Sequence, residues 1–295
     1  MTPDLVMGLA TRIDEAFLLI GAAILLIEIA EALFKRDHVG RTIWEMVVSA
    51  STQIPYLLVE TLILTAGYGV YYILSETVAA WSIPITWWSV MLVLLLADIT
   101  YYWEHRIAHQ VRLLWTQHAV HHSSRDYNIV TGVRFGPLEG VWSLAAHLPL
   151  IVLGFAPELV FFGVIVVLAY QTWLHTELIG KLGPLERVLN TPSHHRVHHG
   201  ADDKYLDRNY GGITIIWDRL FGTFQVEEEP PRYGLKRDFN SRNPVVVWFS
   251  EWPALIRDMA GARSWGEAWA YMVKRPGWRP NGAEHPSEGS PNRSD

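Results

Sequence analysis

Long apolar runs separated by short polar connectors dominate the first two thirds of this chain. The first run, Ala16 to Phe34, is long enough to cross a bilayer, which takes about 20 residues. Two more run from Gln53 to Leu74 and from Trp87 to Trp103. A fourth, from Pro137 to Leu174, is interrupted by the turn residues of Gly154 to Pro157, which predicts a helical hairpin that enters the membrane and returns. The pattern predicts an all-α, multi-pass membrane helical bundle.

Basic residues are distributed unevenly among the connectors. Lys35, Arg36 and Arg41 follow the first run, and four arginines lie in the connector 104–136. The connector 75–86 contains one acid, a proline and no basic residue. Since cytoplasmic connectors carry the excess of Lys and Arg, we expect residues 35–41 and 104–136 on the cytoplasmic side and residues 75–86 on the far side.

Two acids lie inside the apolar runs, where an ionisable residue is a functional candidate. Glu28 is near the end of the first run, and we expect it to face other helices. Glu60 lies within the second run. It is either part of the substrate path or a hydrogen-bonded packing residue.

The composition agrees with a membrane protein and excludes several kinds of site. Half of the 295 residues are hydrophobic and 18% are charged, below the roughly 25% of soluble domains. The net charge of -6 without a basic patch argues against nucleic-acid binding. Cysteine is absent, so disulfides, iron–sulfur clusters and thiolate haem are excluded. We expect the plasma (inner) membrane of a bacterium, or the endoplasmic reticulum if the source is eukaryotic.

Histidines are concentrated between Trp103 and Gly200, which contains eleven of the thirteen. They form an HxxxH pair, two HxxHH boxes and isolated residues: His105 and His109; His118, His121 and His122; His147; His175; His194, His195, His198 and His199. Spacings of three and four residues place side chains on one helix face. One HxxxH pair alone is usually a surface or core feature, but two HxxHH boxes beside it indicate metal ligands.

The number of imidazoles exceeds what one tetrahedral zinc ion uses, so two metal ions in one histidine-rich, cytoplasmic cage are predicted. Asp98 precedes His105 by seven residues and lies on about the same helix face. Its carboxylate is expected either to hydrogen-bond a ligand imidazole or to be a polar residue at a helix end. His147 has no partner at ligand spacing and is expected to be buried and hydrogen-bonded.

Three functions fit such a cage. A zinc hydrolase needs only three ligands and a bound water, so the excess of imidazoles argues against it. A metal transporter is the strongest non-enzymatic alternative, but transporters place ligands near the bilayer midplane, whereas these boxes follow the ends of spans. An oxygen-activating pair of iron ions fits better, because iron can exchange electrons with oxygen and a membrane-facing pocket admits an apolar chain.

The boxes resemble those of the integral-membrane fatty acid hydroxylase and sterol desaturase superfamily. The resemblance covers about Leu96 to Glu228 and is carried by four blocks, which are most similar to the alkylglycerol monooxygenases and their bacterial relatives: YYWEHRIAH, LLWTQHAVHHSSRDYN, HTELIGKLGPLERVLNTPSHHRVHHG and NYGGITIIWDRLFGTF. It implies a non-haem di-iron oxygenase that hydroxylates a lipid chain carbon, such as the one beside an alkylglycerol ether oxygen. A sterol or fatty-acyl desaturase with the same site is the alternative.

Residue by residue, the resemblance implies nine iron ligands: His105, His109, His118, His121, His122, His175, His195, His198 and His199. His194 is expected beside the ligands or facing the substrate, and Asp98, Asn190 and Asn209 are expected to position imidazoles or substrate. The implied partners are a membrane lipid, O2 and an external reductant, either a tetrahydropterin or a cytochrome- or ferredoxin-type donor. No nucleic acid is expected.

The resemblance also divides the chain. We predict N-terminal transmembrane helices over residues 1–95 and a catalytic domain of the fatty acid hydroxylase type over residues 96–228, including a membrane hairpin at 137–174. A cytoplasmic or interfacial cap follows over residues 229–274. Residues 275–295 are rich in Pro, Gly, Ser and Asn and are expected to be a disordered tail.

Overall fold

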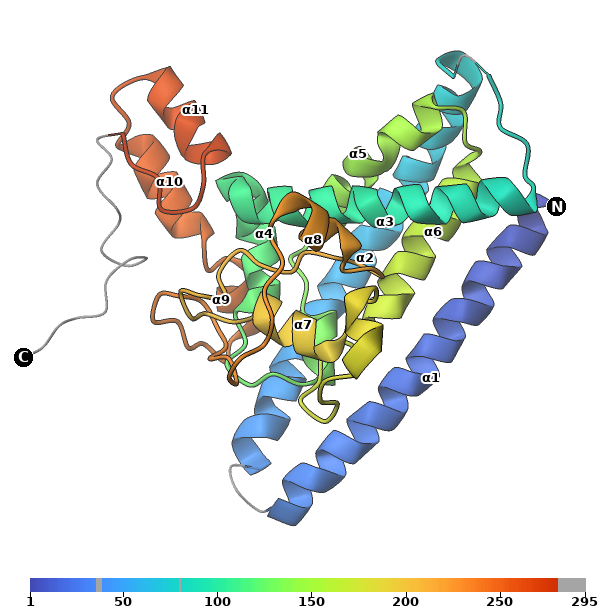
Figure 1. Cartoon of the computed structure of the whole chain (residues 1–295). Coiled ribbons are helices and arrows are strands. Elements are labelled where there is room, and N and C mark those ends of the chain that lie inside the picture. The colour runs from blue at the N-terminus through green and yellow to red at the C-terminus, as the bar shows by residue number, and fades with distance from the viewer. Residues whose placement is uncertain (36–38, 80, 281–295) are drawn as a thin grey trace, which may run out of the picture.

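The computed structural model describes residues 1–35, 39–79 and 81–280 of the chain, and this part contains helices and no β-strand (Figure 1). The predicted all-α class is therefore confirmed for these residues. Two isolated β-bridges, Leu189 with Thr214 and Gly200 with Tyr233, only tie loops together. Arg36, named above, and His285, in the predicted disordered tail, lie outside the described residues.

Two helices are long and apolar enough to cross a membrane among the described residues, namely α1 (Pro3–Lys35) and α2 (Val39–Thr77). The third predicted span is a helix, α3 (Trp87–Gln110), but its aromatic residues and Asp98 lower its mean hydropathy. The hairpin is present as α5 (Glu139–Val152) and α6 (Pro157–Gln171), both shorter than a full span. The multi-pass arrangement remains a prediction.

The N-terminus and two connecting segments meet at one end of the bundle. The amino group of Met1 donates to the carbonyl of Ile85 (2.9 Å), and the N–H of Ile83 donates to the carbonyl of Gly154 (2.8 Å) in the hairpin turn. Gly154 has φ +89°, and a Cβ there would lie 2.4 Å from the carbonyl oxygen of Trp81, so only glycine fits this turn. The connector after α2 and the tip of the hairpin therefore lie at the same end of the bundle.

The core of the bundle lies where α3 packs across α6 and α5 (Figure 1). Val93 and Ala97 of α3 are fully buried, and Gly163 of α6 lies so close to them that a Cβ would be 2.8 Å from Cβ of Ala97. Close backbone approach of this kind is typical of small residues at helix crossings. It fixes the direction in which the C-terminal turns of α3 leave the bundle.

The remaining elements are short and surround the end of α3. They are α4 (Arg112–His122), η1 (Ile129–Val133), η2 (Gly183–Arg187), α7 (Pro192–His198), α8 (Ile216–Phe221), α9 (Pro244–Trp248), α10 (Trp252–Ala260) and α11 (Trp265–Val273). The last three form a cap against α4, where Arg112 pairs with Asp258 (2.6 Å). Arg279 pairs with the same carboxylate (2.7 Å), so the packed chain extends into the predicted tail; residues 281–295 lie outside the described part.

Candidate dimetal centre

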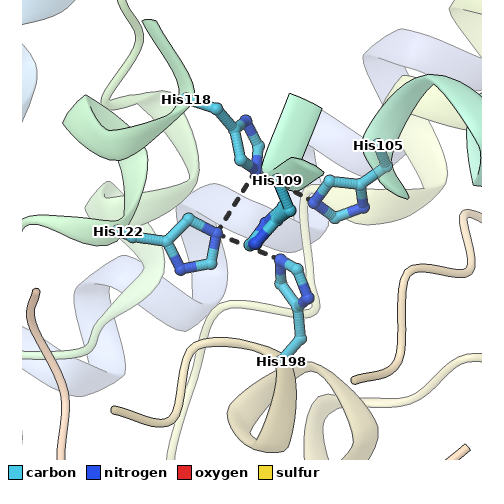
Figure 2. Close-up of side chains that lie close together, drawn as sticks. All are labelled: His105, His109, His118, His122 and His198. Carbon is cyan, nitrogen blue, oxygen red and sulfur yellow. Dashed lines mark hydrogen bonds between the residues drawn. The ribbon is translucent and has the colours of Figure 1, made fainter. Parts of the chain in front are cut away.

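Nine buried histidines form two neighbouring groups, and they are the nine predicted as metal ligands. The first group is His105, His109, His118, His122 and His198 (Figure 2), and the second is His121, His175, His195 and His199. Within each group the potential ligand nitrogens all lie within 4.8 Å of one another. The groups adjoin, since the ring centroids of His122 and His199 are 4.4 Å apart.

The two HxxHH boxes do not each form one group; each is shared between both. His118 and His122 belong to the first group, whereas His121, between them on α4, belongs to the second. The box on α7 is divided the other way: His195 and the C-cap residue His199 belong to the second group, and His198 belongs to the first. The pair on α3 joins the first group, and His175 follows α6 into the second. Two helices therefore connect the two groups directly.

Hydrogen bonds at Nδ1 assign the tautomers of the first group. Nδ1 of His105 donates to the carbonyl of Tyr210 (3.0 Å), Nδ1 of His198 to the carbonyl of Arg208 (2.9 Å), and Nδ1 of His118 to the carboxylate of Glu139 (2.6 Å). These oxygens only accept, so each Nδ1 carries the proton and each neutral ring presents an Nε2 lone pair. The lone pairs of three rings are therefore directed into the group.

The nitrogen spacing fits a bound cation. Nε2 of His105 lies 3.0 Å from Nε2 of His118, yet neither atom has a proton to share. Two metal–imidazole bonds of about 2.1 Å at right angles would separate their nitrogens by about 3.0 Å. The buried Nε2 of His109 has no hydrogen-bond partner among the described residues, which a metal would supply. In the second group, Nε2 of His175 lies 3.2 Å from that of His121 and 2.8 Å from that of His195.

The imidazoles are held in the neutral form that metal binding requires. Burial lowers the pKa of His109 to about 4 and that of His175 to about 3. Burial also depresses the pKa of His121, and the neighbouring His175 depresses it further. Near pH 7 His109, His121 and His175 are therefore uncharged donors.

One short loop supplies most of the contacts behind the first group. It runs from Asp207 to Tyr210, and the Asp207 carboxylate lies 3.5 Å from Nδ1 of His109. Asn209 has φ 55°, a left-handed conformation that asparagine tolerates. Its side chain donates to the carbonyls of His194 (3.1 Å) and Gln225 (2.7 Å), which fixes the loop. Asn209 thus contacts no imidazole in these hydrogen bonds. It holds the loop in place, and the loop in turn contacts histidines of the first group.

Asp98 differs from the expectation that it would hydrogen-bond a ligand imidazole. It accepts hydrogen bonds from the N–H of Ile213 (2.7 Å), the hydroxyl of Thr214 (2.7 Å) and the indole N–H of Trp217 (2.8 Å). Asp98 lies seven residues, or about two helical turns, before His105. At that distance along α3 the carboxylate faces the segment 213–217 and not the imidazole. Asp98 anchors the chain that follows the 207–210 loop.

Two further residues complete this support. Asp218, which no sequence pattern singled out, accepts from the N–H groups of Tyr210 and Gly211 (both 2.8 Å). Asn190, predicted above to position imidazoles or substrate, donates to the carbonyl of Gly211 (2.6 Å). Neither contacts an imidazole, so both position the backbone that hydrogen-bonds His105.

His194, His147 and Glu60 lie outside both groups. The His194 ring is buried and packs edge-to-face on Phe224, at a centroid distance of 5.5 Å. His147 is buried and donates to the carbonyl of Ser143 (2.9 Å), as expected for a core histidine. Glu60 accepts from the hydroxyl of Tyr56 one helical turn away (2.7 Å), which agrees with the packing alternative.

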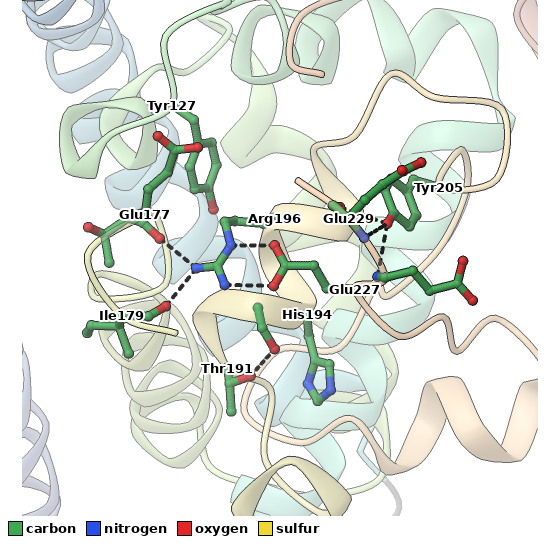
Figure 3. A network of polar contacts seen from close by, with 12 residues as sticks. Tyr127, Glu177, Ile179, Thr191, His194, Arg196, Tyr205, Glu227 and Glu229 are labelled. Atoms are coloured by element: carbon green, nitrogen blue, oxygen red, sulfur yellow. Dashed lines mark hydrogen bonds and ion pairs between the residues drawn. The ribbon is translucent and has the colours of Figure 1, made fainter. Parts of the chain in front are cut away.

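Arg196, between His195 and His198 on α7, is another supporting residue that the sequence did not predict. Its guanidinium forms two 2.7 Å hydrogen bonds with the carboxylate of Glu227 (Figure 3). It also donates to the carbonyls of Thr176 (3.0 Å) and Ile179 (2.7 Å). A bidentate pair fixes both distance and orientation. Arg196 thereby holds α7 against the segment that carries His175.

Comparison with known proteins agrees with this geometry. Residues 90–223 match the model of the fatty acid hydroxylase family. The chain is 42% identical to human alkylglycerol monooxygenase over 200 residues, which cover 68% of this chain and 44% of the human protein. The zebrafish enzyme of the same name is 36% identical over 87% of this chain and 58% of its own length.

A bacterial protein, ornithine lipid hydroxylase OlsE of Rhizobium tropici, is 36% identical over 49% of this chain and 43% of its own. The chain thus spans about half the length of the curated relatives it matches. No solved structure matches it. The resemblance predicted from the histidine boxes is confirmed.

Proposed function

Because residues 90–223 belong to the fatty acid hydroxylase family, we propose that the protein is an integral-membrane, O2-dependent di-iron lipid hydroxylase. Its substrate is a lipid chain carbon, either beside the ether oxygen of an alkylglycerol or in a related lipid. Sequence similarity to alkylglycerol monooxygenases and to an ornithine lipid hydroxylase supports a lipid substrate. The active site faces the cytoplasm, as the basic connectors predict.

The observation that carries the proposal is the convergence of Nε2 atoms in two adjoining groups, three of them in the first group unprotonated. His105 and His118 point lone pairs at each other across 3.0 Å, an arrangement that a cation between them stabilises. Five imidazoles in one group and four in the other would hold two iron ions. Neither group contains a carboxylate, so the ligand set differs from that of soluble di-iron bundles.

When bound, the iron pair would supply the activation of O2 and the removal of hydrogen from the lipid chain. The protein would contribute geometry. Helices α3, α4 and α7 hold most of the imidazoles, and the 207–210 loop and Glu139 keep the protons of His105, His198 and His118 on Nδ1. The lipid must present one carbon to the centre, since small errors in position are costly to the rate. Beside an ether oxygen, a hydroxylated carbon is a hemiacetal, which breaks down to an aldehyde and an alcohol.

Two alternatives remain. A sterol or fatty-acyl desaturase would use the same ligands and remove a second hydrogen in place of hydroxyl transfer. A histidine-rich metal transporter would bind metals without lipid turnover. Most of the histidines lie in the C-terminal turns of α3, α4 and α7. Transporters bind their substrates near the middle of the membrane, so this position near helix ends favours the enzyme over the transporter.

The test combines metal analysis with lipid analysis. Detergent-purified protein should contain about two iron ions per chain, and one zinc ion would contradict the proposal. His121→Ala and His198→Ala, one in each group, should each lower the iron content and abolish turnover, whereas His285→Ala should do neither. Lipids from cells with and without the gene should differ in hydroxylated or ether species. A gain of double bonds would indicate the desaturase, and altered cellular metal with unchanged lipids would indicate the transporter.

A further inference from the structure

A cavity of about 230 Å³ reaches the histidine groups from the side of the cap. His109, His122 and His198 of the first group and His199 of the second contribute to its wall. The indole of Trp115 forms another part of this wall, 5.0 Å from the ring of His109 and 5.6 Å from that of His122 between centroids. The cavity therefore gives direct access to the place where the first metal would bind.

The cavity also has charged side chains in its lining, in contrast to the surface of the long helices. Its mouth contains Lys236 and Arg275, which are exposed, so the cavity opens toward water. On the helices α1 and α2, by comparison, leucines such as Leu19 and Leu62 are more than two-thirds exposed, as suits contact with lipid chains. A lipid chain and a water-soluble molecule would thus approach the centre from different surfaces.

Among the described residues, Arg275 is the one cation of the cavity lining that forms no ion pair, so it is the side chain that can meet an anion there. Three cations line the cavity, Lys236, Arg237 and Arg275, against two acids, Asp207 and Glu251. Arg237 is paired with Glu251 (2.8 Å), and Lys236 with Asp203 (2.8 Å) outside the lining. The buried Nε2 of His109, which has no hydrogen-bond partner among the described residues, lies in this wall. A metal on this nitrogen would add positive charge where the cavity ends.

We propose that this cavity binds a small water-soluble anion in contact with the metal of the first group. Polar reactants would then reach the centre through the cap, without crossing the lipid-facing helices. The inference rests on the proposed function, because the anion is to coordinate the bound metal. It adds a route and a ligand class to that function.

Azide is the probe, since it is a small anion that gives an absorption band on binding to ferric iron. Full-length, iron-loaded protein in detergent would be titrated with sodium azide, together with Ala201→Trp and Leu206→Trp, which fill the cavity. We expect the apparent Kd for azide to rise at least ten-fold in both variants at unchanged iron content. Leu185→Trp, on η2 and outside the cavity, is the matched control and should bind azide as the wild type does.

A charge variant gives an independent measurement. Arg275→Gln removes a cation from the mouth and should weaken azide binding several-fold, with a smaller effect at high salt. If a tryptophan variant loses its iron, the other one and Arg275→Gln decide the result. Wild-type azide affinity in the iron-loaded cavity-filling variants would overturn the inference, as would the absence of an azide band in iron-loaded wild type. Protein without iron would instead overturn the proposed function.

Discussion

The carboxylate of Glu28 accepts a 2.7 Å hydrogen bond from the hydroxyl of Thr176, the residue that directly follows His175. Its second oxygen accepts from the N–H of Ile129 (2.9 Å), the first residue of η1. An acid in an apolar helix is costly unless it has partners. Here the partners are the two segments that enclose His175, so α1 takes part in positioning the second group.

Replacing Glu28 with alanine should destabilise the protein and loosen the second group. The N–H of Ile129 would remain buried without an acceptor, which costs about 1–3 kcal/mol. We expect a lower free energy of unfolding in detergent and an iron content nearer one than two per chain. Glu31→Ala is the control, because Glu31 lies one turn away and pairs with Lys35 at the surface. Equal effects of both substitutions would contradict the assigned role.

Gly132→Ala should disturb the same ligand from the other side. A Cβ on Gly132 would lie 2.8 Å from Nδ1 and 3.2 Å from Cγ of His175, so the ring would have to move. We expect the second iron to bind at least ten-fold more weakly, with a changed Mössbauer signal for one of two sites. Gly69→Ala, on α2 with open space at its Cβ, should leave both sites unchanged. Two unaltered iron signals in Gly132→Ala would show that His175 is not held there.

The metal-free protein should lose stability as the pH falls below about 6.5. Burial lowers the folded-state pKa of His109 to about 4 and of His175 to about 3, from 6.5 in the unfolded chain. Between these values the unfolded chain binds more protons, so each histidine lowers the free energy of unfolding by about 1.4 kcal/mol per pH unit. Thermal unfolding of apoprotein from pH 8 to pH 4.5 measures this slope. His109→Gln should make the slope shallower, and a constant stability over this range would contradict the prediction.

Some of this architecture could be predicted from the sequence. The apolar runs and the Gly154 to Pro157 turn are local patterns, and they predicted the helices and the hairpin. Spacings of three and four predicted which imidazoles share a helix face. They could not predict that His121 and His122 belong to different groups, because that depends on how α4 and α7 meet.

The residues behind the ligands could not be predicted for a related reason. Glu139 lies 21 residues from His118 and Asp218 lies 8 from Tyr210, and no periodic pattern connects them. Asp98 was selected from its helix face, but a distant segment occupies the space it faces. Hydrogen-bond partners of this kind are set by tertiary packing, whereas helix faces are set by local geometry.

Glu139 gives the sharpest test of the first group, because its carboxylate is the one anionic partner at normal hydrogen-bond distance from a ligand Nδ1 among the described residues. Glu139→Gln can place its amide nitrogen or its oxygen toward His118, but it removes the charge that makes the imidazole a better donor to a metal. Loss of such a partner typically weakens metal binding 10- to 100-fold. We expect iron binding in the first group to weaken by this factor, with the second group unchanged.

Competition with a chelator, followed by iron analysis and Mössbauer spectroscopy, would measure this loss. Glu267→Gln is a suitable control, since that acid lies in the first turn of α11 in the cap, away from both groups. Azide binding should weaken with the first site in Glu139→Gln, because the cavity ends at the same metal, whereas Gly132→Ala should leave azide binding intact. Loss of the second iron in Glu139→Gln would instead mean that the two groups bind metal only as a unit.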